Sequence, residues 1–136
     1  MIIKRIPKEA TWELRHTVLW PNEDFSYVQM KEDEDGLHFG LYAEQRLVSV
    51  LSLFVRDGEA QFRKFATLPT EQGKGYGSML LRHVIREAAE LGATRIWCNA
   101  RAAKSGFYER FGLRAKPGES FEKNGVAFCV MERPLP

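Results

Sequence analysis

The sequence predicts a mixed α/β (α+β) fold in which a mostly antiparallel, twisted sheet of six to seven strands is flanked by helices. Three observations carry this prediction. Apolar residues alternate with period two within 37–67, and an apolar stripe with helical spacing runs along 76–91. A chain of 136 residues with 44% apolar content suits a single domain over residues 1–136.

The N-terminal part is expected to form one strand and one helix. Residues Ile2–Ile6 predict a short strand closed by Pro7, and proline fits the first turn of a helix over Lys8–Trp20. The Pro-Asn pair that follows stops this helix. Residues 22–36 are polar and predict a mobile loop with room for one turn of helix, in which the acidic run 32–35 favours a solvated surface over an acidic docking site.

The segment with period two predicts three strands joined by tight turns. We expect these strands over 37–43, 47–55 and 60–67. The turns fall at Glu44-Gln45 and at Asp57-Gly58, of which the second is a strong hairpin signal. Three strands joined in this way form an antiparallel meander.

The remainder of the chain is expected to alternate between helices and strands. The apolar stripe predicts a helix over 76–91 that a glycine stops, followed by a strand over 94–98 and a short helix over 102–111. An Asn-Gly pair favours a tight turn within a final hairpin over 121–131. The expected order is therefore β α β β β α β α β β.

The composition disfavours several classes of protein. Twenty Lys and Arg against 18 Asp and Glu leave a net charge of +2, too balanced for a protein that grips nucleic acid. Cys98 and Cys129 form no CxxC pair and the three histidines lack metal-ligand spacing, so we expect no metal. No apolar run approaches the roughly 20 residues that span a bilayer, and the N-terminus lacks a signal-like apolar stretch. A cytoplasmic protein without membrane contact is the expectation.

The most informative segment is the glycine-rich stretch Gln72–Ser78, which lies between a strand and the strongest helix. Gly73, Gly75 and Gly77 permit backbone torsions closed to other residues and let a ligand approach the main chain. The free N–H groups at the start of the helix point into this loop. A diphosphate fits such a site.

Two other phosphate-binding motifs fit the segment poorly. A Walker loop needs Ser or Thr after its lysine, but Lys74 is followed by Gly75. A Rossmann fingerprint needs a parallel βαβ unit, and antiparallel strands precede this loop. A helix start that only needs flexible glycines remains as the structural alternative.

Two blocks of sequence resemble the GNAT superfamily of N-acetyltransferases. Gln72–Gly77 matches every specified position of its pyrophosphate motif, Gln/Arg-x-x-Gly-x-Gly/Ala. Asn99–Leu113 resembles its later motif, which ends in aromatic-Tyr-x-x-x-Gly-Phe, with Leu113 in place of Phe. Arg15–Pro21 is similar to an Arg-x-x-Val-Leu-x-Pro feature of an uncharacterised bacterial branch. With the element order, the resemblance covers essentially the whole chain.

The resemblance implies transfer of an acetyl group from acetyl-CoA to an amine without a metal, with the sheet splayed between the fourth and fifth strands. Main-chain N–H groups of the loop would hold the diphosphate. The end of the fourth strand would offer main-chain groups to pantetheine and a donor to the thioester carbonyl. The cofactor-binding residues expected on this basis are Phe65, Ala66, Thr67, Gln72, Gly73, Lys74, Gly75, Tyr76, Gly77, Ser78 and Asn99.

Tyr108 is the candidate general acid in the later motif. A phenol with a reference pKa of about 10 can stabilise a leaving thiolate by a hydrogen bond. The alternative is that Tyr108 is a core residue beside Phe107 and Phe111.

No general base can be assigned, although an alkyl amine is mostly protonated at neutral pH and must lose a proton. The candidates are Glu59, Glu23, Glu32 and His16. Each is more simply a solvated surface group or, for His16, a satisfied polar neighbour.

Four further residues have open roles. Asn99 could bind the pantetheine arm or only cap a strand end, and Arg101 could face the cofactor, an acidic acceptor or solvent. Arg15 could bind an acceptor carboxylate or form a surface ion pair. Cys98 is expected to be a small buried residue rather than a nucleophile, because no His lies near it in sequence.

The leading hypothesis is an N-acetyltransferase that moves acetyl from acetyl-CoA to a primary amine of an unidentified small molecule or peptide by direct attack. A catalytically silent acyl-CoA-binding domain is the alternative, and a nucleotide-binding module is a third candidate. We expect no nucleic-acid or membrane partner. The final strands over 121–131 could pair across a homodimer.

Overall fold

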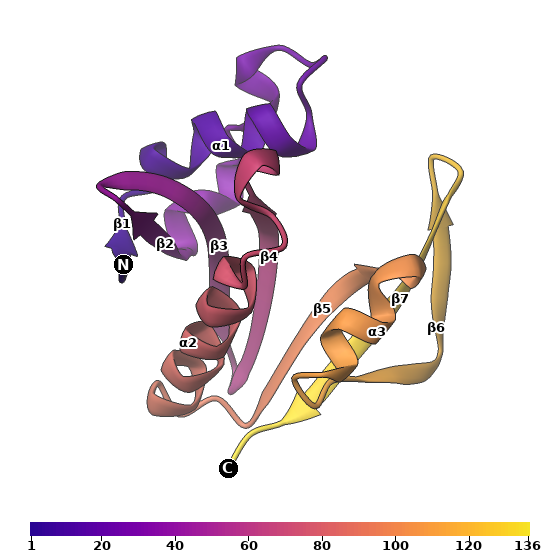
Figure 1. Ribbon diagram of the computed structural model, residues 1–136. Helices are drawn as coiled ribbons and strands as arrows, with labels where there is room; N and C mark the ends of the chain where they lie inside the picture. The colour runs from indigo at the N-terminus through magenta and orange to yellow at the C-terminus, as the bar shows by residue number, and fades with distance from the viewer.

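The computed structural model describes residues 1–136 and contains the strands and helices in the predicted order (Figure 1). The strands are β1 Ile2–Ile6, β2 Leu37–Ala43, β3 Arg46–Arg56, β4 Glu59–Thr67, β5 Arg95–Arg101, β6 Arg114–Lys123 and β7 Val126–Pro134. The helices are α1 Glu9–Leu19, α2 Tyr76–Glu90 and α3 Ser105–Glu109, with 3₁₀ turns η1 Phe25–Val28, η2 Lys31–Asp35, η3 Pro69–Glu71 and η4 Ala102–Lys104.

Four elements in the C-terminal half differ in extent from the prediction, because β6 and β7 extend beyond the hairpin expected over 121–131 and the two elements before them also differ. The helix expected over 102–111 is α-helical only in α3, because η4 precedes it and bonds of the tighter i to i+3 type follow it. β5 continues past Cys98 to Arg101, because it pairs with β7 along its whole length. Residues 99–101 extend β5 along the part of the sheet where it no longer pairs with β4.

The seven strands form one sheet in the order β1-β2-β3-β4-β5-β7-β6. Neighbouring strands are antiparallel except β4 and β5, which are parallel and pair only at Glu59–Gln61 with Arg95–Trp97. Beyond these pairs the two strands diverge, and Figure 1 shows β1–β4 separating from β5–β7. The splay predicted between the fourth and fifth strands is confirmed.

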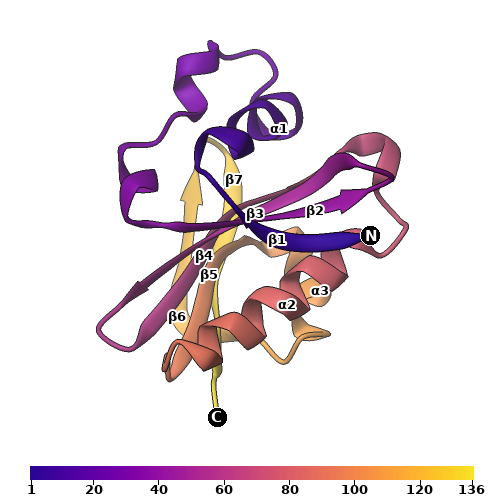
Figure 2. The same cartoon turned by 90° about the vertical axis from the view of Figure 1, so that its left-hand side faces the viewer.

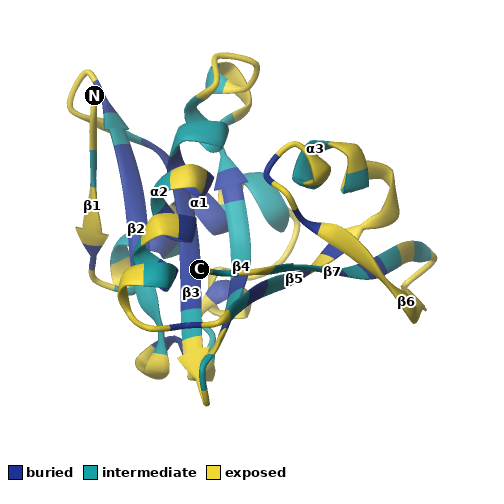
Figure 3. Cartoon of the chain, turned by 90° about the horizontal axis from the view of Figure 1, so that it is seen from below, coloured by how far each residue is buried: buried dark blue, intermediate teal, exposed yellow.

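Helices cover both faces of the first half of the sheet, as Figure 2 shows with α1 on one side of β1–β3 and α2 on the other. The stripe of α2 is buried in the larger core, to which it contributes Leu80, Leu81, Val84, Ile85 and Ala88. A smaller cluster beneath α1 contains Ile6, Leu14, Val50 and Ala66. Figure 3 shows burial concentrated in β2 and β3, while β6 is exposed along its length. None of the helices combines the length and apolar character that a membrane span requires.

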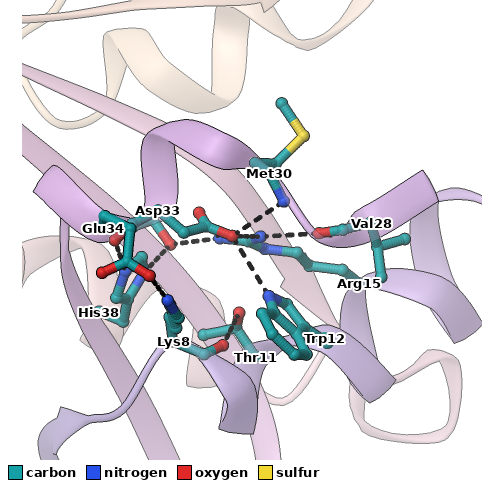
Figure 4. A network of polar contacts seen from close by, with 10 residues as sticks. Lys8, Thr11, Trp12, Arg15, Val28, Met30, Asp33, Glu34 and His38 are labelled. Carbon is teal, nitrogen blue, oxygen red and sulfur yellow. Dashed lines mark hydrogen bonds and ion pairs between the residues drawn. The ribbon is translucent and has the colours of Figure 1, made fainter. Parts of the chain in front are cut away.

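The expectation of a solvated acidic run over 32–35 is wrong for Asp33. This residue lies in η2, and its side chain is buried beneath α1 (Figure 4). Arg15 donates from Nη1 to Asp33 Oδ2 at 2.8 Å and from Nη2 to Asp33 Oδ1 at 3.0 Å. Arg15 is itself fully buried, so it forms neither a surface ion pair nor an open binding site for an acceptor. A charged pair tolerates this burial because the bidentate geometry satisfies both carboxylate oxygens.

Further hydrogen bonds connect the Arg15–Asp33 pair to η1, β3 and β2. Arg15 also donates to the Val28 carbonyl at 3.0 Å and to Ser52 Oγ at 2.8 Å, while His38 contacts Ser52 Oγ at 2.7 Å. Burial alone raises the pKa of the Asp33 carboxyl, but the hydrogen bonds and charge of Arg15 outweigh it and hold that pKa below its usual range. The network therefore fixes η1 and η2 against α1 and β3.

Candidate active site

The splay leaves one edge of β4 without a strand partner. From Phe62 to Thr67, β4 pairs only with β3, while β5 from Cys98 onward pairs only with β7. Such an edge carries main-chain N–H and C=O groups that need hydrogen-bond partners. An extended ligand that contains amides fits there as an added half-strand.

A β-bulge lies on this edge. Val50 pairs with Ala66 and Ser52 with Arg63, so Lys64 and Phe65 together oppose the single residue Leu51. Lys64 has a φ of +56°, in the left-handed region that a residue with a side chain seldom adopts. Backbone strain of this kind concentrates at functional sites, where it redirects main-chain groups and side chains.

The glycine loop follows β4 and leads directly into α2. Gly73 and Gly75 have φ values of +81° and +87°, and a Cβ at either position would meet no atom within 4 Å. Gly75 is the N-cap of α2, so the first N–H groups of the helix lie beside open space. Together these features form a main-chain cradle suited to a diphosphate.

Gly77 has a different role in the same loop. A Cβ there would lie 3.2 Å from Phe65 Cζ and 3.2 Å from Thr67 Oγ1. Its missing side chain therefore lets the first turn of α2 pack closely on β4. Half-buried Tyr76 and Ser78 flank it in that turn.

Polar side chains of the loop are engaged in building it. Gln72 Nε2 donates to the Thr67 carbonyl at 3.0 Å, and Lys74 Nζ forms an ion pair with Glu71 at 3.0 Å. Glu71, through this hydrogen bond and its charge, raises the pKa of the exposed Lys74. The Ala66 side chain is buried beneath α1 and its carbonyl accepts a bond from Ser49 Oγ on β3, so neither of them faces the open edge.

Tyr108 lies on α3 beside the splay. Its ring is 5.7 Å from that of Phe62 on β4 and 5.2 Å from that of Phe107. Burial, and secondarily the charge of Cys98 on β5, raises the pKa of the Tyr108 phenol well above its usual range. The Tyr108 ring thus packs against the core, as predicted by the alternative in which Tyr108 is a core residue. Its raised pKa keeps the phenol protonated, so the hydroxyl can donate a hydrogen bond.

The neighbouring residues of β5 face two ways. Cys98 is buried in the core, and burial raises the pKa of its thiol to about 12, which disfavours the nucleophilic thiolate. Asn99 and Arg101 alternate with core-facing residues and are exposed on the opposite face of the sheet. Tyr108 on α3 lies near Cys98 on the core-facing side of β5, whereas the Asn99 side chain lies on the opposite face of the sheet.

The four candidate bases are dispersed. Glu59 lies where β4 and β5 are still paired, and it forms an ion pair with Arg95 at 2.8 Å, so it lies away from the open part of the splay. Glu23 and Glu32 are exposed. His16 Nε2 contacts the Glu23 carbonyl at 2.6 Å, which makes it the satisfied polar neighbour of the simpler interpretation.

Sequence reasoning missed Lys64. Its Nζ lies 4.6 Å from the centre of the Trp20 ring at the end of α1, on the face opposite α2. The signal that could have found it is a break in period two, because apolar Phe62 is followed by two basic residues and then by apolar Phe65 and Ala66.

Comparison with known proteins gives the family. The sequence matches the acetyltransferase (GNAT) family over residues 7–113. It is 32% identical over 133 residues to the uncharacterised N-acetyltransferase YitI of Bacillus subtilis, covering 91% of this chain and 89% of that protein. The fold is similar to the ribosomal-protein-S18-alanine N-acetyltransferase of Escherichia coli, with a TM-score of 0.82, 20% identity and coverage of 98% and 93% of the two chains. A Bacillus subtilis acetyltransferase in complex with CoA gives a TM-score of 0.76 at 20% identity, covering 98% of each chain.

The class is therefore an acyltransferase built around a splayed sheet, with a glycine loop at the start of α2. More particularly, the chain belongs to the acetyltransferase (GNAT) family. The predicted resemblance is confirmed over most of the chain, and the two structural likenesses show the same fold. Family membership supports acetyl-CoA as the acyl donor.

Proposed function

We propose that this protein transfers acetyl from acetyl-CoA to a primary amine of a small molecule or peptide, by direct attack of the amine on the thioester. The observation that carries the proposal is the junction of an unpaired β4 edge with a glycine loop at the start of α2. The edge fits the amides of pantetheine and the loop fits a diphosphate. Both halves of CoA thus have a matching main-chain surface.

The cofactor would be held mostly by main chain. Phe65 and Thr67 would offer main-chain groups along the β4 edge, while Ala66 between them holds the edge to β3 through its bond with Ser49. The N–H groups of Gln72–Ser78 would surround the diphosphate, and open space at Gly73 and Gly75 leaves room for it. Asn99 would contact the pantetheine arm from β5.

The donor would supply an activated thioester, and the protein would stabilise the charge that develops when the amine attacks. A main-chain N–H at the bulge is the candidate donor to the carbonyl oxygen. Removal of one such donor typically costs about 2.7–4 kcal/mol of transition-state stabilisation. The strained φ of Lys64 supports a redirected N–H at this point.

Tyr108 would act as the general acid. The C–N bond forms first, and as the C–S bond then breaks, the Tyr108 hydroxyl donates its proton to the departing sulfur. The proton lost by the amine then returns to the phenol through solvent. The position of Tyr108 beside the splay supports this role. Its raised pKa keeps the phenol protonated but makes it a weaker acid, so the hydrogen bond to the sulfur must form before the proton moves.

The acceptor can be a small molecule or a peptide terminus. The Escherichia coli structure of similar fold is named for an enzyme that acetylates an alanine of a ribosomal protein, which keeps peptide amines in the proposal. Exposed β6 is the last strand of the sheet, so pairing of this edge across a homodimer stays a prediction.

Ligand titrations followed by turnover test the proposal. Calorimetry with CoA, acetyl-CoA, ATP and NAD should detect binding of the first two only. Free-thiol release should then appear with at least one member of a primary-amine panel. CoA binding without thiol release would indicate a silent acyl-CoA-binding domain, and binding of ATP or NAD but not CoA would indicate a nucleotide-binding module.

A further inference from the structure

Lys64 lies where the splay opens, and its side chain has no acidic partner. It is half-buried, rests over the Trp20 ring, and takes part in none of the ion pairs of the structure. The Asp33 carboxylate acts electrostatically on Lys64, but it forms its ion pair with Arg15 and not with Lys64. A partly buried ammonium without an anion is unfavourable, because it has lost hydration without gaining a counter-charge.

The sheet face around Lys64 is electropositive. Arg63 is its neighbour on β4, and Lys123 acts on it from the β6–β7 hairpin. Arg15 of α1 also acts on Lys64, although its charge is paired with Asp33. Two carboxylates also occupy this face, Glu59 and Glu132, but both are bound to Arg95, at 2.8 Å and 2.6 Å. Arg63, Lys64 and Lys123 take part in none of the ion pairs of the structure, so the open part of the splay presents their positive charge without a counter-charge.

We propose that Lys64 binds a carboxylate of the acceptor, so that the acceptor is a primary amine carrying a carboxylate a few bonds away. The inference rests on the proposed function and names its substrate class. Lys64 adjoins Phe65, whose main chain faces the donor in that proposal, while the Lys64 side chain points to Trp20 on the α1 face. One small molecule can therefore place its amine at the thioester and its carboxylate at Lys64.

The same field that disfavours the ammonium attracts an anion. Burial, and then the charges of Arg63, Arg15 and Lys123, lowers the pKa of Lys64 to about 8 against a smaller opposing effect of Asp33. A bound carboxylate would relieve this repulsion and raise the pKa again. Lys64 is thus a specificity-determining residue that is charged at neutral pH and neutral in alkaline solution.

Matched acceptors test the carboxylate preference by thiol release at saturating acetyl-CoA. One pair is β-alanine and β-alaninamide, and the other is Asp-Ala-amide and Asn-Ala-amide, so the pairs distinguish a free amino acid from a side-chain carboxylate of a peptide. The wild-type should favour the carboxylate member of at least one pair by about tenfold to a hundredfold in kcat/KM. Equal rates within both pairs would overturn the inference and leave the proposed function standing.

Variants connect the preference to one side chain. Lys64→Gln should remove it through KM rather than kcat, and Lys64→Arg should restore most of it. The control is Lys4→Gln, because Lys4 lies 4.9 Å over the Tyr42 ring at the far edge of the sheet and should not affect the preference. The ratio of wild-type to Lys64→Gln kcat/KM on one carboxylate acceptor should fall as pH rises through about 8. A preference that survives Lys64→Gln would contradict the inference.

Binding measurements separate this inference from the proposed function. Calorimetry of the CoA-saturated protein with each amide and carboxylate needs no turnover. Tighter binding of the carboxylate that is lost in Lys64→Gln supports the inference even if no amine is acetylated, in which case only the proposed function fails. Equal binding of both members overturns it, and so does acetylation of Lys64 itself, detected by mass spectrometry after incubation with acetyl-CoA alone.

Discussion

Beside the splay, the two faces of the first half of the sheet offer a ligand different groups. On the side of the glycine loop, the protein offers main chain, from the β4 edge, the N-terminus of α2 and the residues around Gly73 and Gly75. On the side of α1 it offers side chains, held by the buried Arg15–Asp33 pair and including Lys64 over Trp20. A site built from main chain should keep its ligand affinity when side chains are changed, and lose it when backbone torsions are restricted. A site built from side chains should lose its ligand affinity when those side chains are changed.

The largest expected effect tests whether any side chain is needed for the chemistry. Tyr108→Phe should lower kcat by about 10²–10⁴, because the hydroxyl that donates to the leaving sulfur is lost. The Kd for CoA should change little, since the ring and its contacts with Phe62 remain. Tyr42→Phe, on β2, is the control and should leave kcat unchanged. A Tyr108→Phe enzyme with wild-type kcat would remove the general-acid assignment.

The second effect concerns the framework of the α1 side. Arg15→Met should lower the free energy of unfolding by about 3–5 kcal/mol, because it leaves the buried Asp33 carboxylate unpaired. The double variant Arg15→Met/Asp33→Leu should recover part of this loss, since it removes both charges. Urea unfolding measures both values. A single variant as stable as the wild-type would show that the pair does not hold α1 and η2 together.

The same pair predicts a dependence of stability on acid pH. The Asp33 pKa is lowered by folding, so the ionised carboxylate contributes stability above its unfolded pKa of about 4, and this contribution is lost as pH falls through the lower folded value. The stability difference between wild-type and Asp33→Asn should therefore be largest near neutral pH and shrink below about pH 4. Thermal unfolding from pH 7 to pH 2 measures it. A difference that grows toward acid pH would contradict the assignment.

A pair of glycines sharpens the prediction for the main-chain side. Gly75 and Gly92 lie at opposite ends of α2 with the same φ of +87°, and a Cβ at either residue would meet no atom within 4 Å. Alanine at either site should destabilise the fold by about 1–2 kcal/mol, because the left-handed region disfavours Cβ. Only Gly75→Ala should also weaken CoA binding, by roughly tenfold. Equal Kd values for the two variants in calorimetry would exclude the loop from the binding site.

The smallest expected effect is at Lys74, the charged side chain of the loop. Lys74 is exposed and already paired with Glu71, so Lys74→Gln should change the Kd for CoA by less than about threefold. Calorimetry at low and moderate salt measures the change. A loss of tenfold or more would show that a side-chain charge, rather than the main chain, holds the diphosphate.

The sequence predicted the main-chain side more completely than the side-chain side, for physical reasons. Glycine spacing, strand alternation and the α2 stripe are local features, and the family resemblance joins them into the splayed fold. Asp33 belongs to an acidic run, and nothing local indicates that Arg15 will remove it from water. Lys64 is redirected by a bulge whose register depends on pairing with β3, so its position follows only from tertiary structure.

The central claim is that the Gln72–Ser78 loop binds the diphosphate of CoA, and amide NMR spectra recorded during a CoA titration test it most directly. We expect saturable shifts of the N–H signals of Gly73, Gly75 and Gly77, together with a shift of the Phe65 signal on the β4 edge. Shifts confined to another surface, or unchanged spectra at millimolar CoA, would contradict it.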